Sequence, residues 1–209
     1  MSKEKGLFVV IEGSNGSGKT TLINGLGERG YTTLSSPNGT DLAKFLRPAC
    51  RGVEPWEGID KKIQFLLFSA ARLDEYIRCV EATNDVVIAD RWWTSTYVYQ
   101  CVLQGISSQF MENTIHDNEK LDLVILLDGE DDVLLDRMNS ERSKNPDHGK
   151  CTWTQSEDTL RSLMKIYRED LPVYLESKGI ECMVIDTTNR NQEEVLEVAY
   201  SKIEEMNNG

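Results

Sequence analysis

The sequence predicts an α/β fold in which helices flank both faces of a mostly parallel sheet. Two observations lead to this prediction. Short apolar runs alternate with longer helical patterns along the chain, which is the order expected of βαβ units. The apolar runs are also continuous rather than alternating, as is typical of strands that are covered on both faces. A length of 209 residues fits one domain, residues 1–209, with a sizeable core.

Four apolar runs are predicted to form buried strands. Each is short and rich in valine, isoleucine and leucine: Leu7–Ile11, Val86–Ala89, Leu123–Leu127 and Cys182–Ile185. A fifth and weaker candidate is Tyr31–Leu34. Strands of this kind would form the centre of the sheet.

Helical patterns occupy the stretches between these runs. Residues 60–82 carry apolar side chains on a wide helical stripe, which predicts a mostly buried helix. Residues 156–177 are also helical in pattern, and Pro172 predicts a break or kink in that helix. Three further helices are expected, at residues 20–29, 92–104 and 193–206.

Composition argues against several classes of function. There are 23 Lys and Arg against 35 Asp and Glu, a net charge of -12. General binding to nucleic acid or to anionic membranes is disfavoured, because it needs a basic surface. Five scattered cysteines and two histidines indicate neither a disulfide scaffold nor a zinc site. The charged N-terminus precedes only a short apolar run, so we expect no signal peptide or membrane span and a cytoplasmic location.

A phosphate-binding loop follows the first predicted strand. Residues 13–20 read GSNGSGKT, match the pattern G-x-x-x-x-G-K-[ST] and precede a helical stretch. Glycines let consecutive N–H groups point at one anion, and the helix N-terminus adds partial positive charge. Lys19 is expected to reach the β- and γ-phosphates, and Thr20 to ligate Mg²⁺. The expected nucleotide-binding residues are Gly13, Ser14, Asn15, Gly16, Ser17, Gly18, Lys19, Thr20 and Thr21.

This loop predicts a P-loop NTPase-type fold but leaves a small-molecule kinase, an ATPase motor and a GTPase open. A chain of 209 residues leaves little room for motor or regulatory domains, and the guanine-reading tetrad N-K-x-D is absent from the sequence. Both observations favour a kinase. Asp128, at the end of the third apolar run, is either a ligand of Mg²⁺ or simply a polar strand end.

A charged motif follows the second apolar run. Residues 90–100 read DRWWTSTYVYQ, and the carboxyl ends of parallel strands are where open α/β sheets bind ligands. The stretch resembles the D-R-[aromatic]-x-x-S-x-x-A-Y-Q signature of thymidylate kinases, with Val98 in place of alanine. Further segments resemble the family in the same order along nearly the whole chain: Pro37–Thr40 with Phe45–Arg47, Phe68–Arg72, Leu123–Asp128 with Leu135–Arg137, and Ile185–Asp186 with Glu193–Val195.

The resemblance implies transfer of the γ-phosphoryl group of Mg²⁺-bound ATP to dTMP, giving dTDP and ADP. It implies that Arg47 and Arg91 clamp the acceptor phosphate, and that Asp90 holds Arg91 or a water on Mg²⁺. A homodimer is expected from the resemblance alone. The cations of the site would form one positive cleft in an acidic shell: Lys19, Arg47, Arg72, Arg91, Arg137 and Arg142.

The resemblance also implies contacts to the acceptor nucleoside. Phe68 and Arg72 are four residues apart and share a helix face. In the family the phenylalanine stacks on the base and the arginine donates to a thymine carbonyl. Tyr99 would lie under the sugar and exclude a 2′-hydroxyl, while Ser95 and Gln100 would line the base pocket.

Two positions in the phosphate loop depart from the family pattern. Asn15 stands where the family usually has an acidic residue that contacts the sugar 3′-hydroxyl, so that hydrogen bond would form without charge. Gly16 stands where some members carry an arginine that neutralises the transferring phosphoryl group. We therefore expect the catalytic arginine to come from another part of the chain.

That other part is a polar, charge-rich segment at about residues 139–154, which predicts a mobile lid. Arg142 is the first candidate for the catalytic arginine. Lys144 and Lys150 are the alternatives, and Arg137, at the entrance to the lid, is expected to bind ATP. Closure of a lid would exclude water, which otherwise could hydrolyse ATP.

Three other functions remain open at this stage. A deoxynucleoside kinase would phosphorylate a sugar hydroxyl and would need a general base, for which Glu12 and Asp90 are the available carboxylates. A kinase that acts on a broader range of deoxynucleoside monophosphates could share the same motifs. A nucleotide-sensing switch would bind ATP and a partner protein without any dTMP-dependent release of ADP.

Overall fold

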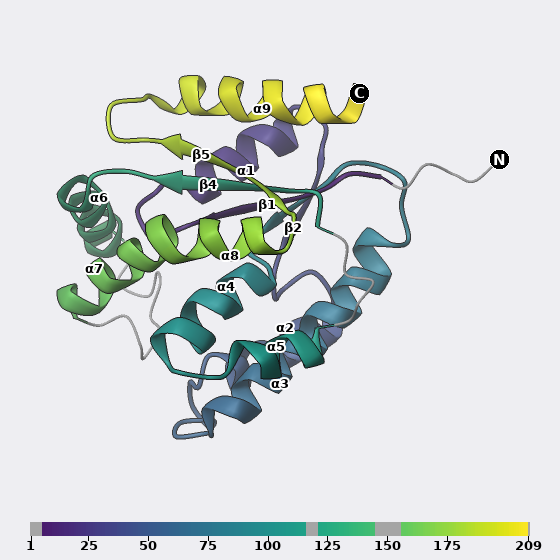
Figure 1. Cartoon of the computed structure of the whole chain (residues 1–209), viewed down its shortest axis with the longest axis vertical. Helices are drawn as coiled ribbons and strands as arrows, with labels where there is room; N and C mark the ends of the chain where they lie inside the picture. The colour runs from purple at the N-terminus through teal and green to yellow at the C-terminus, as the bar shows by residue number, and fades with distance from the viewer. Residues whose placement is uncertain (1–5, 116–120, 145–155, 209) are drawn as a thin grey trace.

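The computed structural model describes residues 6–115, 121–144 and 156–208. Its centre is one sheet of five parallel strands in the order β2-β3-β1-β4-β5 (Figure 1). The strands are β1 (Phe8–Gly13), β2 (Thr32–Ser35), β3 (Val87–Asp90), β4 (Leu123–Asp128) and β5 (Glu181–Asp186). All five predicted strands are confirmed with small shifts at their ends, including the weak candidate that became β2.

The register of the sheet gathers the carboxyl ends of the strands at one edge. Strand β1 lies in the middle, with Ile11 opposite Asp90 of β3. On its other side, Gly13 lies opposite Leu127 of β4. Because the strands are parallel, the residues that follow β1 and β3 emerge close together, and this edge carries the site.

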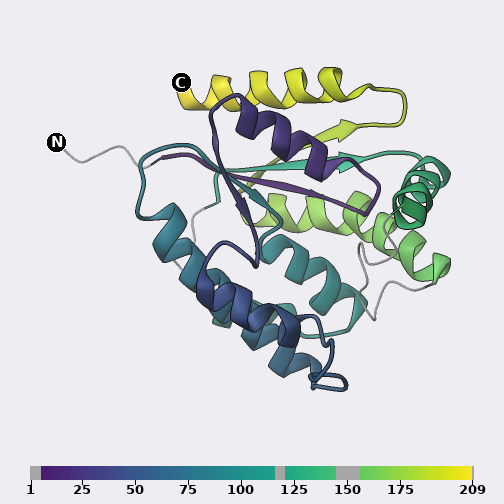
Figure 2. The same ribbon diagram turned by 180° about the vertical axis from the view of Figure 1, so that it is seen from behind.

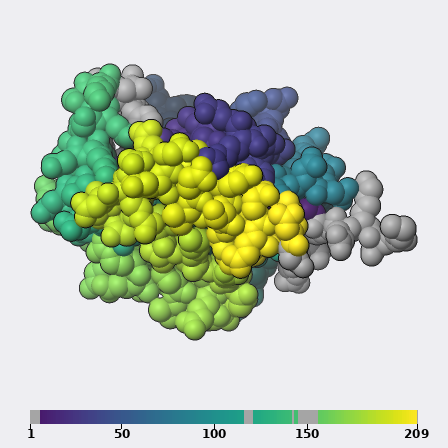
Figure 3. All heavy atoms as spheres, turned by 90° about the horizontal axis from the view of Figure 1, so that it is seen from above, coloured from purple at the N-terminus to yellow at the C-terminus, as the bar shows by residue number. Residues whose placement is uncertain are grey.

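Two helices cover one face of the sheet. Helix α1 (Lys19–Glu28) and helix α9 (Gln192–Asn208) lie side by side there, as Figures 2 and 3 show. The core on this face includes Val9 and Ile11 of β1, together with buried apolar residues of both helices. The alternate residues of β1 turn to the other face, so both faces of the strand are buried, as its continuous apolar sequence predicts.

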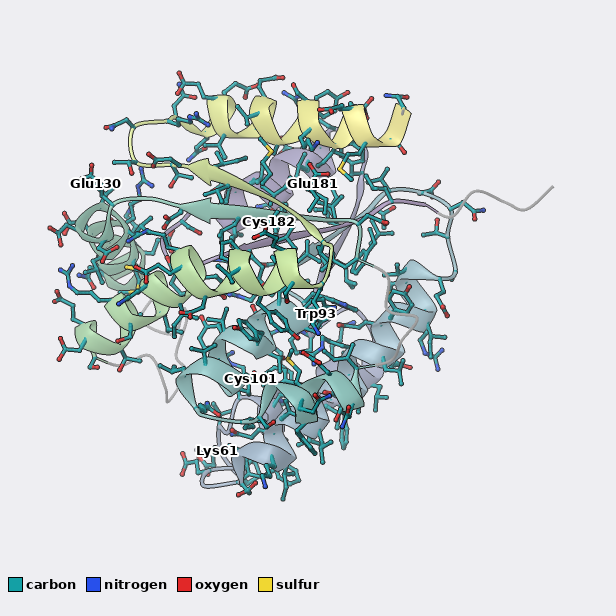
Figure 4. All side chains as sticks on the ribbon, in the orientation of Figure 1. Lys61, Trp93, Cys101, Glu130, Glu181 and Cys182 are labelled. Carbon is teal, nitrogen blue, oxygen red and sulfur yellow. The ribbon has the colours of Figure 1, made fainter. Side chains whose placement is uncertain are left out.

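A larger helical layer covers the other face. Its members are α3 (Lys61–Glu75), α4 (Trp93–Thr96), α5 (Ser108–Thr114), α7 (Glu157–Lys165) and α8 (Leu171–Ser177). Phe8 and Val10 of β1 pack into this core. Trp93 and Cys101, labelled in Figure 4, also belong to it. Among the described residues, no helix is both long and apolar enough to cross a bilayer.

Each of the three longer helices on this face contains a π-helical turn. The turns are η1 (Tyr76–Val80), η2 (Tyr97–Leu103) and η3 (Ile166–Asp170). The break expected at Pro172 takes this form, because η3 directly precedes α8 and Pro172 lies in the first turn of α8. Proline has no N–H to donate to a carbonyl of the preceding turn, so the regular ladder is interrupted there.

Helix α2 (Asp41–Cys50) was not predicted. Its start is capped by Thr40, whose hydroxyl accepts a hydrogen bond from the N–H of Ala43 at 3.1 Å. Pro48 lies inside the helix, and the apolar residues Leu42 and Phe45 are exposed (45% and 77%), so the apolar positions do not mark the buried face. Helix α5 was missed as well, since it is short and mostly exposed.

The prediction of a loop at about residues 139–154 is wrong for residues 139–144. Residues 139–144 are the last turns of helix α6 (Asp131–Lys144), and residues 145–154 lie outside the described part of the chain. The polar composition that suggested a loop is the exposed surface of α6. Its apolar residues form a small separate core with α7: Leu134, Leu135, Met138, Leu160 and Met164.

Candidate active site

The phosphate loop turns sharply between β1 and α1. Gly13 has a φ of 142° and Gly18 a φ of 92°, and both values disfavour residues with a side chain. A Cβ on Gly13 would also lie 2.4 Å from the carbonyl oxygen of Leu127 in β4. The loop therefore needs glycine both for its backbone conformation and for its packing against the neighbouring strand.

Lys19 begins α1 and lies folded inside the loop. Its ammonium group donates to the carbonyl oxygen of Ser14 at 2.6 Å and lies 3.5 Å from Ser17 Oγ. Only 7% of the residue is exposed. Burial, with a smaller contribution from the charge of Arg91, lowers the pKa of Lys19 to about 7. The protein alone thus stabilises this charge poorly, and an anionic phosphate in the loop would favour it.

A cavity of about 980 Å³ opens on the outer side of the loop. The predicted ATP-binding residues that line it are Gly16, Ser17, Gly18, Thr21 and Arg137. The guanidinium group of Arg137 is held by hydrogen bonds to Thr187 Oγ1 (3.1 Å) and to the Thr187 carbonyl (2.9 Å). Arg190 and Asn191, which no sequence motif indicated, also line this cavity.

Arg91 follows β3 and faces the phosphate loop. Its φ of 67° is the only positive value at a non-glycine residue in the described part of the chain, which marks stored backbone strain. The backbone is held there by a hydrogen bond from Arg91 N–H to Ile11 O at 3.1 Å. Its Nη2 donates to Asn15 Oδ1 at 3.2 Å. The predicted acceptor-side arginine and the donor loop are therefore in direct contact.

A buried carboxylate lies behind Arg91. Glu12 is fully buried, and its Oε2 lies 3.6 Å from Arg91 Nη1. Its oxygens accept hydrogen bonds from Thr94 Oγ1 (2.5 Å), from Ser95 Oγ (2.8 Å) and from the hydroxyl of Tyr167 (3.2 Å). The hydroxyl of Ser95 is thus bound to Glu12, and its predicted place in the base pocket stays a prediction.

Tyr99 and Gln100 lie on the π-helical turn η2. The ring of Tyr99 is 5.7 Å from the guanidinium carbon of Arg91, so the predicted sugar-contacting tyrosine and the phosphate-clamping arginine are neighbours. Gln100 is almost fully buried on the same turn.

Asp90 has a carboxylate oxygen that could take part in metal binding. Its Oδ1 is buried and has no hydrogen-bond partner among the described residues, although such atoms are usually paired. Thr20 lies exposed at the start of α1. Carboxylate and hydroxyl oxygens are ligands that Mg²⁺ accepts, so these two residues fit the ion. Asp128, by contrast, accepts hydrogen bonds from Arg168 at 2.7 and 3.1 Å. This ion pair fits a structural role for Asp128 at the end of β4.

Arg72 is buried on α3, with only 3% of the residue exposed. Its guanidinium donates to Thr96 Oγ1, and its Nη2 lies 3.3 Å from Ser69 Oγ. Phe68 lies one turn earlier on α3 and is half-buried. The predicted pair thus shares one helix face, with the arginine fixed by a hydroxyl from α4 that the sequence did not indicate.

Arg47 projects from α2 toward the loop that precedes it. Its Nη1 donates to the carbonyl oxygen of Pro37 at 2.9 Å. Burial, together with the like charge of Arg51, lowers the pKa of Arg47. An anionic ligand would offset both effects, as expected for a phosphate clamp.

Glu75 holds the loop that carries Pro37. It is fully buried on α3 and accepts hydrogen bonds from Ser36 Oγ (2.6 Å), Asn38 N–H (2.7 Å) and Gly39 N–H (2.6 Å). Burial raises the pKa of this carboxyl. Its spacing from Arg72, three residues on the same buried helix, was the signal in the sequence that could have drawn attention to it.

The lid cations are only partly described. Arg142 lies in α6, but its side chain is outside the described part of the structure. Lys150 lies wholly outside the described residues. Lys144 lines the cavity beside the phosphate loop. The assignment of a catalytic lid cation stays a prediction.

A parallel sheet with a phosphate loop after its central strand, and with Arg91 at the end of the neighbouring strand, defines a P-loop nucleotide kinase. The family model "Thymidylate kinase" matches residues 11–197. The chain therefore belongs to the thymidylate kinase family of phosphotransferases.

Individual relatives agree with this assignment. The thymidylate kinase of Shouchella clausii (strain KSM-K16) is 27% identical over an alignment of 219 residues, covering 98% of this chain and 96% of the relative. That of Chlamydia felis (strain Fe/C-56) is 31% identical over 153 residues, covering 66% and 72%. The probable thymidylate kinase of Thermoplasma acidophilum is 26% identical over 214 residues, covering 94% and 95%.

Proposed function

We propose that residues 1–209 act as one kinase domain that transfers the γ-phosphoryl group of ATP to dTMP, giving dTDP and ADP. The observation that carries the proposal is the contact between Arg91 and Asn15, at 3.2 Å. It joins a cation at the end of β3 to the loop that would hold the donor phosphates. A phosphate bound by Arg91 would therefore lie beside the γ-phosphate of ATP.

The donor phosphates would be held by backbone N–H groups of the loop and by Lys19. The N-terminus of α1 adds its partial positive charge at the same place. The low pKa of Lys19 means that a bound phosphate would draw a proton onto this side chain and be neutralised by it. Mg²⁺, when bound near Thr20 and Asp90, supplies further positive charge for the transferring group.

The acceptor phosphate would be held by Arg47 and Arg91. A nucleoside monophosphate is largely dianionic at neutral pH, since its second pKa is about 6. Its oxygen can attack without a general base, so the task of the protein is to hold two anions in line and offset their repulsion. Phe68, Arg72 and Gln100 would fix the thymine base, and Tyr99 would exclude a 2′-hydroxyl.

Phosphorylation of a nucleoside hydroxyl is less well supported. That reaction needs a carboxylate within reach of the substrate oxygen. Glu12 is fully buried, and hydroxyl groups occupy both of its oxygens. It is therefore held as a structural anion behind Arg91 and cannot reach a substrate hydroxyl without rearrangement.

We also propose that two copies of the chain form a homodimer through α3 and η1. Ile63, Leu66 and Ile77 are 48%, 46% and 52% exposed and follow one helical stripe. Exposed apolar residues gathered on one helix face are typical of a protein interface. Leu66→Glu should reduce the mass measured by light scattering to that of one chain. Lys62→Glu, beside the stripe, should leave it unchanged, and a single-chain mass for the unmodified protein would contradict the dimer.

A cytoplasmic location is consistent with the cysteines. The described ones, Cys50, Cys79, Cys101 and Cys182, are free thiols. Burial raises the pKa of each of them, so little of the reactive thiolate forms. Unpaired, unreactive thiols are the usual pattern in a reducing compartment.

A panel of acceptors tests the proposed reaction. Release of ADP from Mg²⁺-bound ATP would be measured with dTMP, thymidine, dCMP and ribosylthymine monophosphate. We expect dTMP to give the fastest turnover. Turnover with thymidine and none with dTMP would contradict the proposal, and equal rates with dTMP and dCMP would favour a broader deoxynucleoside monophosphate kinase.

A further inference from the structure

The hydroxyl group of Tyr167 lies between the carboxylate of Glu12 and the guanidinium group of Arg91. It donates to Glu12 Oε2 at 3.2 Å and accepts from Arg91 Nη1 at 2.7 Å. Ser95 Oγ is 3.3 Å away. Only 1% of Tyr167 is exposed, and Arg91, 76 residues earlier in the sequence, reaches it through the fold alone.

The backbone around Tyr167 supports this placement. The residue belongs to the π-helical turn η3, and π-helical turns inside α-helices often occur at functional sites. The extra residue in such a turn changes the direction of the side chains that follow the preceding α-helix. Burial raises the pKa of Tyr167 well above its ordinary value, so the hydroxyl keeps the proton that it donates to Glu12.

The separation of Glu12 from Arg91 matters for the charge that faces the phosphates. The two side chains are 3.6 Å apart at their nearest polar atoms, which is longer than a charge-assisted hydrogen bond. A closer ion pair would be stronger, because Coulomb attraction grows as the distance falls. It would also draw the guanidinium away from Asn15 and from the phosphate loop, where Nη2 now points.

We propose that Tyr167 is a positioning residue for the acceptor phosphate, whose hydroxyl spaces Arg91 from Glu12 so that the guanidinium faces the substrate. The hydroxyl, together with Ser95 Oγ at 3.0 Å, satisfies Oε2 of Glu12, the oxygen nearest to the guanidinium. The hydroxyl of Tyr167 is also the nearer of two acceptors of Nη1 of Arg91, at 2.7 Å against 3.2 Å for Ser95 Oγ, and Nη2 is directed at the phosphate loop. This inference rests on the proposed function, since it assigns Arg91 to dTMP.

Tyr167→Phe removes the hydroxyl and keeps the ring. We expect the KM for dTMP to rise about 10-fold, the magnitude of one hydrogen bond to a charged group. The KM for ATP should change less than about twofold, since the cavity beside Arg137 is not affected. Initial rates of ADP release, measured while each substrate is varied in turn, give both constants.

Tyr174→Phe is the matched control. Its hydroxyl also donates to a carboxylate, Glu112 Oε1, at 3.1 Å. It lies on α8 in the same helical stretch, with its ring edge-on to Trp93 (labelled in Figure 4) at 6.3 Å. Both variants lose a phenol–carboxylate hydrogen bond and should lower Tm, but only Tyr167→Phe should raise the KM for dTMP. Equal dTMP constants in the two variants would overturn the inference.

A double substitution tests the spacing itself. In a Glu12→Gln background the attraction that pulls Arg91 inward is gone, so adding Tyr167→Phe should raise the KM for dTMP by less than about twofold. If Tyr167→Phe raised the KM for dTMP by the same factor with and without Glu12→Gln, that result would contradict a spacing role. If Tyr167→Phe does not fold, Tyr167→His, which retains a polar hydrogen-bonding group, should keep a KM closer to that of the unmodified protein than Tyr167→Leu does. Absence of dTMP-dependent ADP release from the unmodified protein would instead refute the proposed function.

Discussion

The proposed donor and acceptor halves of the site are built in different ways. The donor half is one run of consecutive residues whose backbone N–H groups and single lysine would hold the phosphates. The acceptor half is a set of side chains from α2, α3, η2 and the residue that follows β3, and each arginine is fixed by a partner from elsewhere in the chain. The donor half therefore depends on local conformation, whereas the acceptor half depends on long-range packing and can be damaged from a distance.

The largest effect is expected from the donor half. Lys19→Ala should lower kcat by roughly 10³-fold or more, because it removes the positive charge next to the transferring phosphoryl group. The fold should persist, since the protein partners of Lys19 are a carbonyl and a hydroxyl of its own loop. Steady-state kinetics and circular dichroism measure the two outcomes. Lys44→Ala, at an exposed position on α2, is the control, and retained turnover in Lys19→Ala would remove this mechanism.

Arg91→Ala tests the connection between the halves. We expect kcat/KM for dTMP to fall by roughly 10²- to 10³-fold, as the acceptor phosphate loses a bidentate partner. Stability should fall by about 1–3 kcal/mol, because Glu12 keeps its buried charge and loses the opposing one. Urea unfolding gives the second quantity. Arg91→Lys should restore stability better than activity, since it keeps the charge but not the planar fork; equal recovery of both would argue against phosphate binding by Arg91.

Glu75→Gln isolates the packing that supports the acceptor half. The amide would present an N–H group to a loop that offers mainly donors, so the loop that holds Arg47 should shift. We expect the KM for dTMP to rise about 5- to 10-fold and stability to fall by about 1–2 kcal/mol, with the KM for ATP unchanged. Kinetics with each substrate varied in turn separate these effects. Glu81→Gln, exposed after η1, should change neither constant, and an equal rise in both constants for Glu75→Gln would contradict a purely acceptor-side role.

The smallest predicted effect is a proton uptake in the donor half. The folded protein lowers the pKa of Lys19 from 10.5 to about 7, so this side chain is mostly neutral at about pH 8.5. Bound phosphates favour its charged form and should raise its pKa, so ATP binding should take up close to one proton. Calorimetry in two buffers with different ionisation enthalpies measures that number. Lys19→Met should abolish the uptake, and uptake that persists in this variant would assign it to another group.

The difference between a donor half built from consecutive residues and an acceptor half built from distant ones also explains what could be predicted from the sequence. The five strands and the phosphate loop were predicted because each is contiguous and carries its own pattern. Phe68, Arg72 and Tyr99 were predicted only through a resemblance that spans several segments, whereas Arg91 was also indicated by its place after a buried strand.

The missed features are the ones that depend on three-dimensional contacts. Tyr167 has no motif around it and meets Arg91 only after the helical layer packs on the sheet. Residues 139–144 looked like a loop because a helix with a small apolar stripe and a long exposed face has little hydrophobic pattern. The hydrogen bond from Ser95 to buried Glu12 is likewise invisible in a motif.

The most direct test of the account follows the label from [γ-³²P]ATP when dTMP and thymidine are offered together at equal concentrations. The contact between Arg91 and the phosphate loop predicts that the label appears in the β-phosphate of dTDP, and that Arg91→Ala nearly abolishes this product. Label recovered mainly in dTMP formed from thymidine would contradict the central claim, since the acceptor half would then bind a hydroxyl and not a phosphate.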